Sequence, residues 1–211
     1  MPRSAPEMPG RLAQSAFQLF SERGFEAVTL DQIAARAGVT KGSFYSHFKS
    51  KQDIIRGACA HYYRSYQRRV HEALAPLSDP TQRLRRVLEL SVRTCVLDRG
   101  NRVFTTEIFA LLLQDEEVRR GWMQFYDTVR EMYLGLVHAV QVAEREPVPD
   151  PRRAVDLMLA AMEGIKMRAA FEPQLGDRCE QEAIVSDLLR ILGFPLSSPS
   201  FASSAPTQDS K

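Results

Sequence analysis

The chain has 211 residues, of which 44% are hydrophobic and 26% are charged, and this composition excludes a disordered or collagen-like protein. The length allows one large or two small globular domains. The formal net charge is only +2, but residues 1–71 carry 11 Lys and Arg against 5 Asp and Glu, whereas the remainder carries 17 against 21. The first third is therefore the part suited to a polyanionic partner.

Several classes of site have no sequence support. The cysteines Cys59, Cys95 and Cys179 are isolated and the four histidines show no metal-ligand spacing, so we expect no disulfide framework, metal or cofactor. The sequence has no nucleophile elbow, phosphate loop or metal motif, which argues against an enzyme. It also has neither an uncharged apolar run of about 18 residues nor a signal-peptide core, so it predicts a cytoplasmic protein without a membrane segment.

The first expected helix covers residues 9–23, where apolar side chains recur at helical spacing. The second begins after Thr29 and ends near residue 37. Thr29 and Gln32 form a capping box at its start, and Gly38 can adopt the left-handed conformation that ends a helix. Helices this short are marginal in water unless they bury an apolar face against a neighbour, so these segments are expected to form a small bundle.

Two further helix starts follow closely. Thr40 is the expected N-cap of a third, very short helix, and Ser50 with Asp53 marks the start of a fourth. The unpaired N–H groups of a helix start can receive a phosphate, and Gly42 has no side chain to keep the third helix out of a major groove about 12 Å wide. This pattern is typical of a helix-turn-helix DNA reader. Phe44 is expected on the apolar, core side of the same helix, as is Phe48.

The run Thr-Leu-Asp-Gln-Ile-Ala-Ala-Arg-Ala-Gly-Val, followed by Thr-Lys-Gly-Ser-Phe-Tyr-Ser-His-Phe-Lys-Ser-Lys, closely resembles the DNA-binding domain of tetracycline-repressor-type (TetR family) transcriptional regulators. The resemblance covers about residues 9–56. It implies phosphate contacts from Thr29, Thr40, Tyr45, His47 and Lys51. It places Lys41, Gly42 and Ser43 towards the bases.

No strand alternation appears, so the whole chain is expected to be all-α. The later helices are expected at residues 54–74, 79–97, 103–113, 115–144, 151–171 and 178–192, with a loop at 98–101. The sequence thus predicts a helix-turn-helix domain at 1–56, ordered from about residue 9, and a helical ligand-binding and dimerisation domain at 57–194. The segment 195–211 is rich in Ser and Pro and is expected to be a disordered tail.

An aromatic stripe in the expected helix 115–144 has two interpretations. Simple core packing accounts for it, but two adjoining apolar faces also fit a ligand cavity between helices. The residues that we assign to such a cavity are Phe104, Glu107, Trp122, Tyr126, Tyr133, Met162 and Glu163. If either glutamate faced the cavity unpaired, its buried charge would favour a cationic ligand.

The expected helix 151–171 is apolar nearly all round and must be covered on several sides. Together with the stripe Ile184, Leu188 and Ile191 of the last helix, it could form a four-helix interface across a twofold axis, which is how the family it resembles dimerises. An ordinary intramolecular core explains about half of this apolar surface equally well.

These features favour a homodimeric, ligand-responsive transcriptional regulator. We expect it to be a repressor that binds a palindromic operator in double-stranded DNA and is released by a small, largely apolar effector. Two alternatives stay open: a DNA-binding regulator whose C-terminal domain engages a protein partner, and, with less support, an enzyme whose site is assembled only in space.

Overall fold

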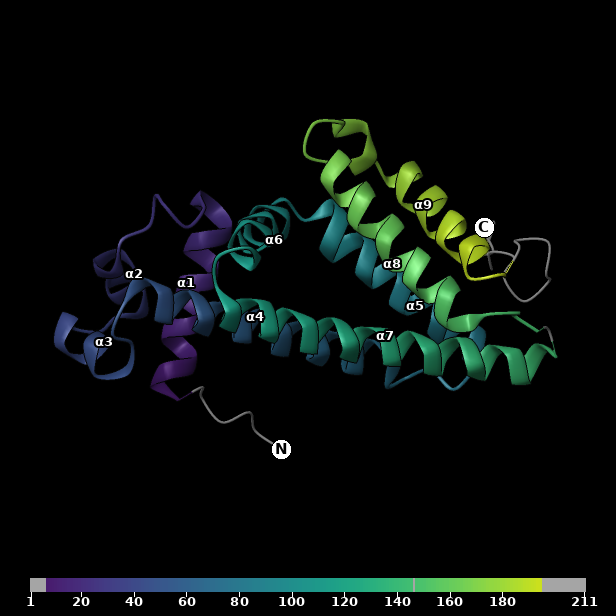
Figure 1. The fold of residues 1–211 in the computed structure, drawn as a ribbon, viewed down its shortest axis with the longest axis horizontal. Coiled ribbons are helices and arrows are strands. Elements are labelled where there is room, and N and C mark those ends of the chain that lie inside the picture. The colour runs from purple at the N-terminus through teal and green to yellow at the C-terminus, as the bar shows by residue number, and fades with distance from the viewer. Residues whose placement is uncertain (1–6, 146, 195–211) are drawn as a thin grey trace, which may run out of the picture. The chain divides into compact units, whose positions relative to one another are not determined.

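The computed structural model describes residues 7–145 and 147–194, and these residues form helices and turns without any strand (Figure 1). The α-helices are α1 (Met8–Arg23), α2 (Leu30–Ala37), α3 (Lys41–His47), α4 (Lys51–Leu74), α5 (Pro80–Ser91), α6 (Arg99–Leu112), α7 (Glu116–Glu144), α8 (Pro151–Arg168) and α9 (Arg178–Ile191). A π-helix, η1 (Val92–Leu97), follows α5, and a 3-10 helix, η2 (Pro173–Gly176), precedes α9. The all-α prediction is confirmed.

The described residues divide into two compact units. The first contains residues up to Glu72 together with Thr94–Val129, and the second contains Ala73–Arg93 together with the residues from Arg130 onward. The long helices α4 and α7 each run from one unit into the other. The segment 195–211, which the sequence predicts to be disordered, lies outside the described residues.

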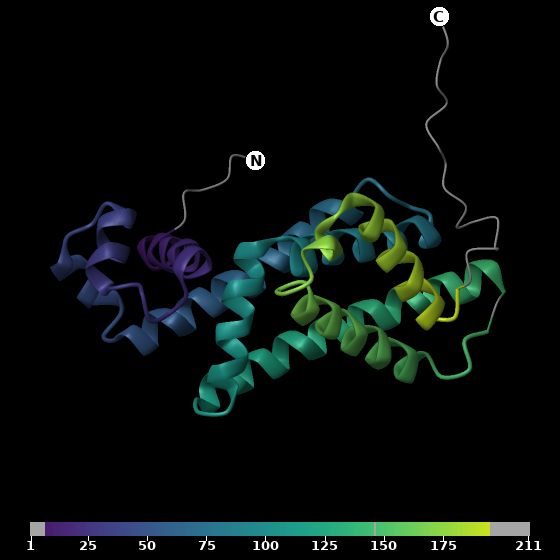
Figure 2. The same cartoon turned by 90° about the horizontal axis from the view of Figure 1, so that it is seen from above.

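The first unit is built on α1. Its residues Leu12, Ala16 and Phe20 are fully buried, as are Ile33 of α2 and Ile54 of α4. Burying a large apolar side chain contributes about 1.5–3 kcal/mol, which a helix of seven or eight residues needs because it cannot persist alone. The small bundle that the sequence predicts is therefore present, with α1 packed on α2 and α2 on α3 (Figures 1 and 2).

Helix α6 packs against α1 in the same unit. The Phe104 ring lies 4.9 Å from Phe17 and 5.6 Å from Phe25, in edge-to-face geometry. Gly24 ends α1 with φ +79°, and a Cβ there would lie 2.6 Å from Oε1 of Glu107. Glycine therefore suits this position for two reasons. Its positive φ is unfavourable for residues with a side chain, and the missing Cβ leaves room for Glu107 of α6.

The structure corrects the loop that the sequence predicts at 98–101. Asp98 Oδ1 accepts a hydrogen bond from the backbone N–H of Asn101 at 2.8 Å, so α6 begins at Arg99. An aspartate at this position is a good N-cap, and this cap outweighs the turn tendency of the following glycine and asparagine. The expected helix 79–97 is also divided in the structure. The α-helix α5 ends at Ser91, and the chain continues as the π-helix η1 to Leu97.

The second unit contains α5, α8, α9 and the later part of α7. Helix α9 packs against both α5 and α8 (Figures 1 and 2). Tyr133 is fully buried and donates a hydrogen bond from its hydroxyl to Oγ of Ser91 at 2.8 Å, and Arg130 pairs with Asp156 at 2.6 Å. Within the described ranges, none of the helices combines the length and apolar character that a bilayer crossing requires.

Candidate DNA interface

Helix α2 and the turn after it are fixed by local contacts. Thr29 Oγ1 accepts a hydrogen bond from the Gln32 backbone N–H at 3.3 Å, and the Gln32 side chain accepts one from the Thr29 N–H at 3.0 Å. Gly38 has φ +67°, in the left-handed region, and its N–H satisfies carbonyls at the end of α2. The predicted capping box and glycine stop are confirmed, and they set the direction in which the chain enters α3.

Helix α3 presents a polar face to solvent. Thr40 Oγ1 caps it by accepting a hydrogen bond from the Ser43 N–H at 3.2 Å. Phe44 is 1% exposed, which confirms its predicted place in the core, whereas the adjacent Tyr45 is 38% exposed and His47 is exposed. Because Phe44 anchors one side of this short helix, the other side is held outward.

Gly42 lies in the first turn of α3 and is exposed. Apart from its chain neighbours and the backbone of its own helix, a Cβ built on it would have no atom of the described residues within 4 Å, and its φ is not in the left-handed region. Neither internal packing nor backbone geometry therefore requires glycine here, although glycine costs a helix about 1 kcal/mol relative to alanine. The position has the form expected where another molecule approaches the backbone closely.

The cationic side chains of this region are held by weak exposed contacts. The Lys41 ammonium lies 3.0 Å from the Asp31 carboxylate, and the hydrogen bond and charge of Asp31 raise the pKa of Lys41. Lys51 Nζ donates to the Glu26 carbonyl at 3.1 Å. Exposed ion pairs contribute little to stability, so Lys41 can exchange Asp31 for another partner at small cost.

Lys49 is a cation that the sequence reasoning did not include. It is exposed immediately after α3, and its Nζ donates to the Tyr45 carbonyl at 2.8 Å, near the end of that helix. The sequence signal was present, since a lysine directly after a short helix that carries cationic side chains is a candidate for backbone phosphates.

The structure brings most of the predicted DNA contacts onto one short segment. Thr40, Lys41, Gly42, Ser43, Tyr45 and His47 lie on α3 or at its cap. Of these, Ser43 is half-buried and the others are exposed. Thr29 is exposed at the start of α2, and Lys51 is half-buried at the start of α4.

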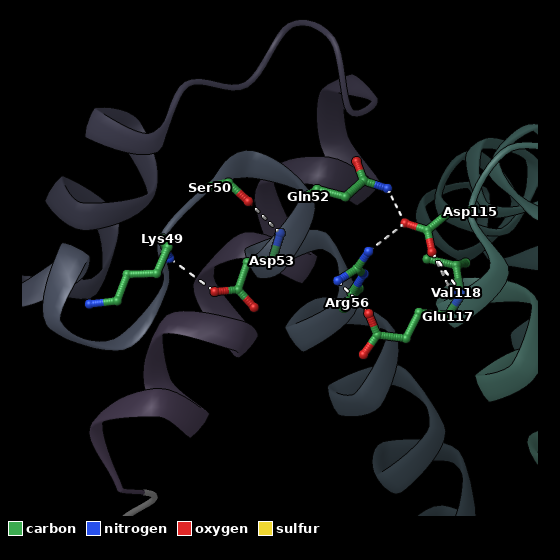
Figure 3. Close-up of polar contacts among 8 residues, drawn as sticks. All are labelled: Lys49, Ser50, Gln52, Asp53, Arg56, Asp115, Glu117 and Val118. Atoms are coloured by element: carbon green, nitrogen blue, oxygen red, sulfur yellow. Dashed lines mark hydrogen bonds and ion pairs between the residues drawn. The ribbon is translucent and has the colours of Figure 1, made fainter.

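The start of α4 is tied to the start of α7 (Figure 3). Ser50 Oγ accepts a hydrogen bond from the Asp53 N–H at 3.1 Å and caps α4. Gln52 Nε2, in the first turn of α4, and Arg56 Nη2, one turn later, both donate to Oδ2 of Asp115, at 2.5 and 3.1 Å. The element that follows α3 is therefore anchored to a residue about 60 positions away in the sequence.

Asp115 serves two helices at once. Its Oδ1 accepts hydrogen bonds from the N–H groups of Glu117 and Val118, at 2.9 and 3.0 Å, which caps α7 as the sequence predicts. Burial opposes the charge of this carboxylate, but the hydrogen bonds from Val118, Gln52 and Arg56, with the charge of Arg56, outweigh it and lower the pKa of Asp115 to about 2. Sequence reasoning missed the link to Gln52 and Arg56.

Comparison with known proteins decides the family of this chain. The family described as bacterial regulatory proteins, tetR family, matches residues 12–58, and the BetI-type transcriptional repressor C-terminal family matches residues 80–193, more than half of the chain. The chain belongs to the TetR family of bacterial transcriptional regulators. The structure of a transcriptional regulator from Saccharomonospora viridis in complex with choline has the same fold, with a TM-score of 0.76 and 19% identity over 86% of this chain and 95% of that one.

Two relatives that match this chain by sequence are also transcriptional regulators. The uncharacterised regulator YerO of Bacillus subtilis is 41% identical over 56 residues, which are 26% of this chain, so the chain spans only 19% of that protein's length. The regulator AcrR of Shigella flexneri is 24% identical over 83% of this chain and 84% of its own length. The high identity is thus found in a short match, and the longer match retains far less.

The residues predicted to line a cavity in this TetR-family chain fall into two groups. Phe104, Glu107, Trp122 and Tyr126 belong to the first unit, whereas Tyr133, Met162 and Glu163 belong to the second. Glu107 lines a cavity of about 320 Å³ together with Phe25, Lys51 and Gln52.

The other predicted cavity residues have defined surroundings. Trp122 is buried among aromatic rings, Phe104 and Tyr133 are fully buried, and Met162 is 6% exposed. Glu163 pairs with the buried ammonium of Lys166, so it does not meet the condition of an unpaired carboxylate on which the cationic-ligand hypothesis depended.

Proposed function

We propose that this protein is a dimeric repressor that reads a palindromic operator with α3. The observation that carries the proposal is Gly42, an exposed helical glycine that no internal contact explains, between Lys41 and Ser43 on a face that Phe44 holds outward. A helix with a bare backbone at this point can lie low in a major groove. Residues up to about 56 then form the reading domain, and residues 57–194 hold the effector and the partner subunit.

Exposed apolar side chains support the dimer. Leu157 and Met167 of α8 are 49% and 47% exposed and share one face of the helix with the exposed Gly164. Phe171, in the turn just after α8, is 71% exposed. Ile191 of α9 is also 36% exposed. A second copy of α8 and α9 across a twofold axis would cover these side chains. Leu157→Glu is then expected to yield monomers in sedimentation equilibrium, with helix content unchanged.

Dimerisation lets the protein recognise a longer DNA sequence than one short reading helix can. One α3 contacts only a few base pairs, whereas two related by symmetry read half-sites one or more DNA turns apart, about 34 Å per turn. A small effector shifts the equilibrium between conformations only by its differential affinity for them. The family relative solved with choline supports a small molecule in this role, rather than a protein partner or a substrate to be turned over.

The test is selection from random duplex DNA with the purified full chain. We expect this selection to enrich one palindromic sequence. Tyr45→Ala and Lys51→Ala should weaken binding to all sequences, because they remove phosphate contacts. Lys41→Ala should in addition relax discrimination at one position of each half-site. Unchanged operator affinity in folded Tyr45→Ala and Lys51→Ala proteins would refute the assignment.

A further inference from the structure

Asp31 places a negative charge on the surface that is proposed to meet DNA. It lies in the first turn of α2, and 64% of its side chain is exposed. Its two carboxylate oxygens lie 3.0 and 3.1 Å from Nζ of Lys41, the residue of α3 that is expected to face the bases. A carboxylate repels the phosphates that supply nonspecific affinity for DNA, so its presence at this point requires an explanation.

Folding stability explains only part of this placement. A carboxylate in the first turn of a helix interacts favourably with the helix dipole, and an exposed ion pair adds a small gain. However, the start of α2 already has the capping box of Thr29 and Gln32. Among the described residues, the Asp31 carboxylate accepts its hydrogen bond from the Lys41 ammonium and none from a backbone N–H. Its contact is therefore with the reading helix and not with its own.

The three lysines of the reading domain differ in the kind of partner they have. Lys49 Nζ donates to the Tyr45 carbonyl at 2.8 Å, and Lys51 Nζ donates to the Glu26 carbonyl at 3.1 Å. Because a carbonyl is neutral, these two ammonium groups keep their full charge for a phosphate. Within the part of the chain that the structure describes, Lys41 is the one lysine of the three whose ammonium pairs with a carboxylate.

This difference separates two kinds of DNA contact. A lysine without an acidic partner is a point charge with three N–H donors, so it binds phosphates whatever the sequence. The charges of Lys41 and Asp31 cancel, and moving Lys41 to a phosphate would leave the carboxylate unpaired beside another anion. A base edge is neutral, and in the major groove guanine presents two acceptors, O6 and N7. Lys41 can donate to such acceptors with its remaining N–H groups while it keeps Asp31.

We propose that Asp31 is a positioning residue for sequence recognition, which keeps the Lys41 ammonium from the DNA phosphates and leaves it available to a neutral acceptor on a base edge. This inference rests on the proposed function, because it requires α3 to lie in the major groove. Asp31 thereby lowers the affinity for DNA of any sequence and raises the ratio of operator affinity to nonspecific affinity. Lys49 and Lys51 supply charge that acts independently of sequence.

The experiment compares two duplexes bound by the full chain, the selected operator and a scrambled duplex of the same length and composition. Fluorescence anisotropy at several salt concentrations gives both affinities. In Asp31→Asn, Lys41 is free to bind a phosphate, so we expect the affinity for the scrambled duplex to rise about fivefold, the size of an exposed ion pair, while the operator affinity changes little. The plot of log affinity against log salt for the scrambled duplex should become steeper by about one.

The Tm distinguishes this role from a structural one. Asp31→Asn should lower the Tm slightly, because it removes an exposed ion pair and a favourable charge at the start of α2. A role in folding alone predicts that the affinities for both duplexes fall together with the Tm. The proposed role predicts instead that the affinity for the scrambled duplex rises while the Tm falls.

Three variants show whether Asp31 acts through Lys41. Asp31→Glu retains a carboxylate within reach of Lys41 and should retain the wild-type ratio of operator to scrambled affinity. Glu26→Gln is the matched control, because it removes one exposed negative charge from the same unit and leaves the Lys41 pair intact, so the ratio should stay at the wild-type value. In the Lys41→Ala background, Asp31→Asn should leave the ratio unchanged, because the ammonium that it positions is absent.

The outcomes separate this inference from the proposed function. An unchanged ratio in Asp31→Asn would overturn the inference, as would an equal fall in Glu26→Gln or a fall that persists without Lys41. Each of these results leaves the selected operator, and with it the proposed function, in place. Failure of the wild-type chain to select any operator would instead overturn the proposed function, and this inference with it.

Discussion

The helix-turn-helix segment, residues 28–53, and the Asp115 cluster, formed by Asp115 with Gln52, Arg56, Glu117 and Val118, belong to the same unit but are held by different kinds of contact. In the first, the side chain of each cap reaches a backbone group three residues away, at Thr29 and Thr40. In the second, one carboxylate joins helices about 60 residues apart. Local hydrogen bonds therefore fix the reading helix α3, and a long-range contact fixes α4, the helix that follows it.

This difference predicts how the two regions respond to change. Loss of a local cap weakens one short helix and costs about a single hydrogen bond. Loss of the Asp115 carboxylate removes the acceptor of Gln52 and Arg56 and the cap of α7 at the same time. The mutations below separate these effects, and they also separate stability from DNA affinity.

The largest effect is expected from Phe44, the buried side chain of the short reading helix α3. Phe44→Ala empties a fully buried site and should lower the free energy of unfolding by about 3–5 kcal/mol, measured by chemical denaturation. Operator binding should be lost with it. The neighbouring Tyr45→Ala is the control, since this side chain is 38% exposed; a comparable loss of stability there would contradict the assignment of the two faces of α3.

The next effect concerns Asp115. Asp115→Asn should lower the free energy of unfolding at pH 7 by about 1–3 kcal/mol, because a neutral amide is a weaker acceptor for Arg56. The pKa of Asp115 in the folded protein is lowered from 3.8 to about 2, so its stabilising charge is fully present above about pH 4 and is lost as the pH falls towards 2.

The pH dependence supplies the control for that prediction. The stability difference between wild type and Asp115→Asn should shrink between about pH 4 and pH 2 in denaturation curves recorded at each pH. A difference that stays constant across this window would show that the carboxylate charge does not hold the Asp115 cluster together.

Removal of a local cap should have a smaller effect. Thr40→Ala deletes the hydroxyl that accepts from the Ser43 N–H and should cost about 1 kcal/mol of stability. Thr40→Ser retains the oxygen and should retain most of the stability in thermal unfolding. Equal destabilisation by the two substitutions would place the role of Thr40 in its methyl group and not in the cap.

The smallest expected change is a gain in folding stability, whereas the changes above are losses. Gly42→Ala should stabilise the folded protein by about 0.5–1 kcal/mol, since no packing opposes a Cβ there, yet weaken operator binding about tenfold. Gly135→Ala in α7 is the matched control, because this glycine is also helical, exposed and open. It should show a similar gain in stability with unchanged DNA affinity; an undiminished affinity in Gly42→Ala would remove the main support for groove entry.

The sequence was most informative where the determining contacts are short-range. The capping box at Thr29, the glycine stop at Gly38 and the buried side of α3 follow from residues three or four positions apart, so the pattern alone predicts them. The predicted loop at 98–101 is wrong because the Asp98 side chain caps α6 there. This cap is also a short-range signal, since Asp98 and Asn101 are three residues apart.

Long-range packing could not be predicted in the same way. From the sequence, an intramolecular core explains about half of the apolar surface of α8 and α9 as well as a dimer interface does. In the structure, Met158 and Leu188 are buried, whereas Leu157 is exposed. Which side faces inward depends on neighbours distant in the chain. For the same reason, the Gln52 and Arg56 contacts of Asp115 have no signature in any window of the sequence.

Chemical interference on the selected operator tests the central claim most directly. Guanine N7 methylation and replacement of thymine by uracil alter only groups that face the major groove. Entry of α3 from each subunit predicts two clusters of modifications that block binding, centred one or more DNA turns apart, and a weaker central effect in Gly42→Ala. Binding that is insensitive to every major-groove modification would contradict the claim that α3 reads the operator.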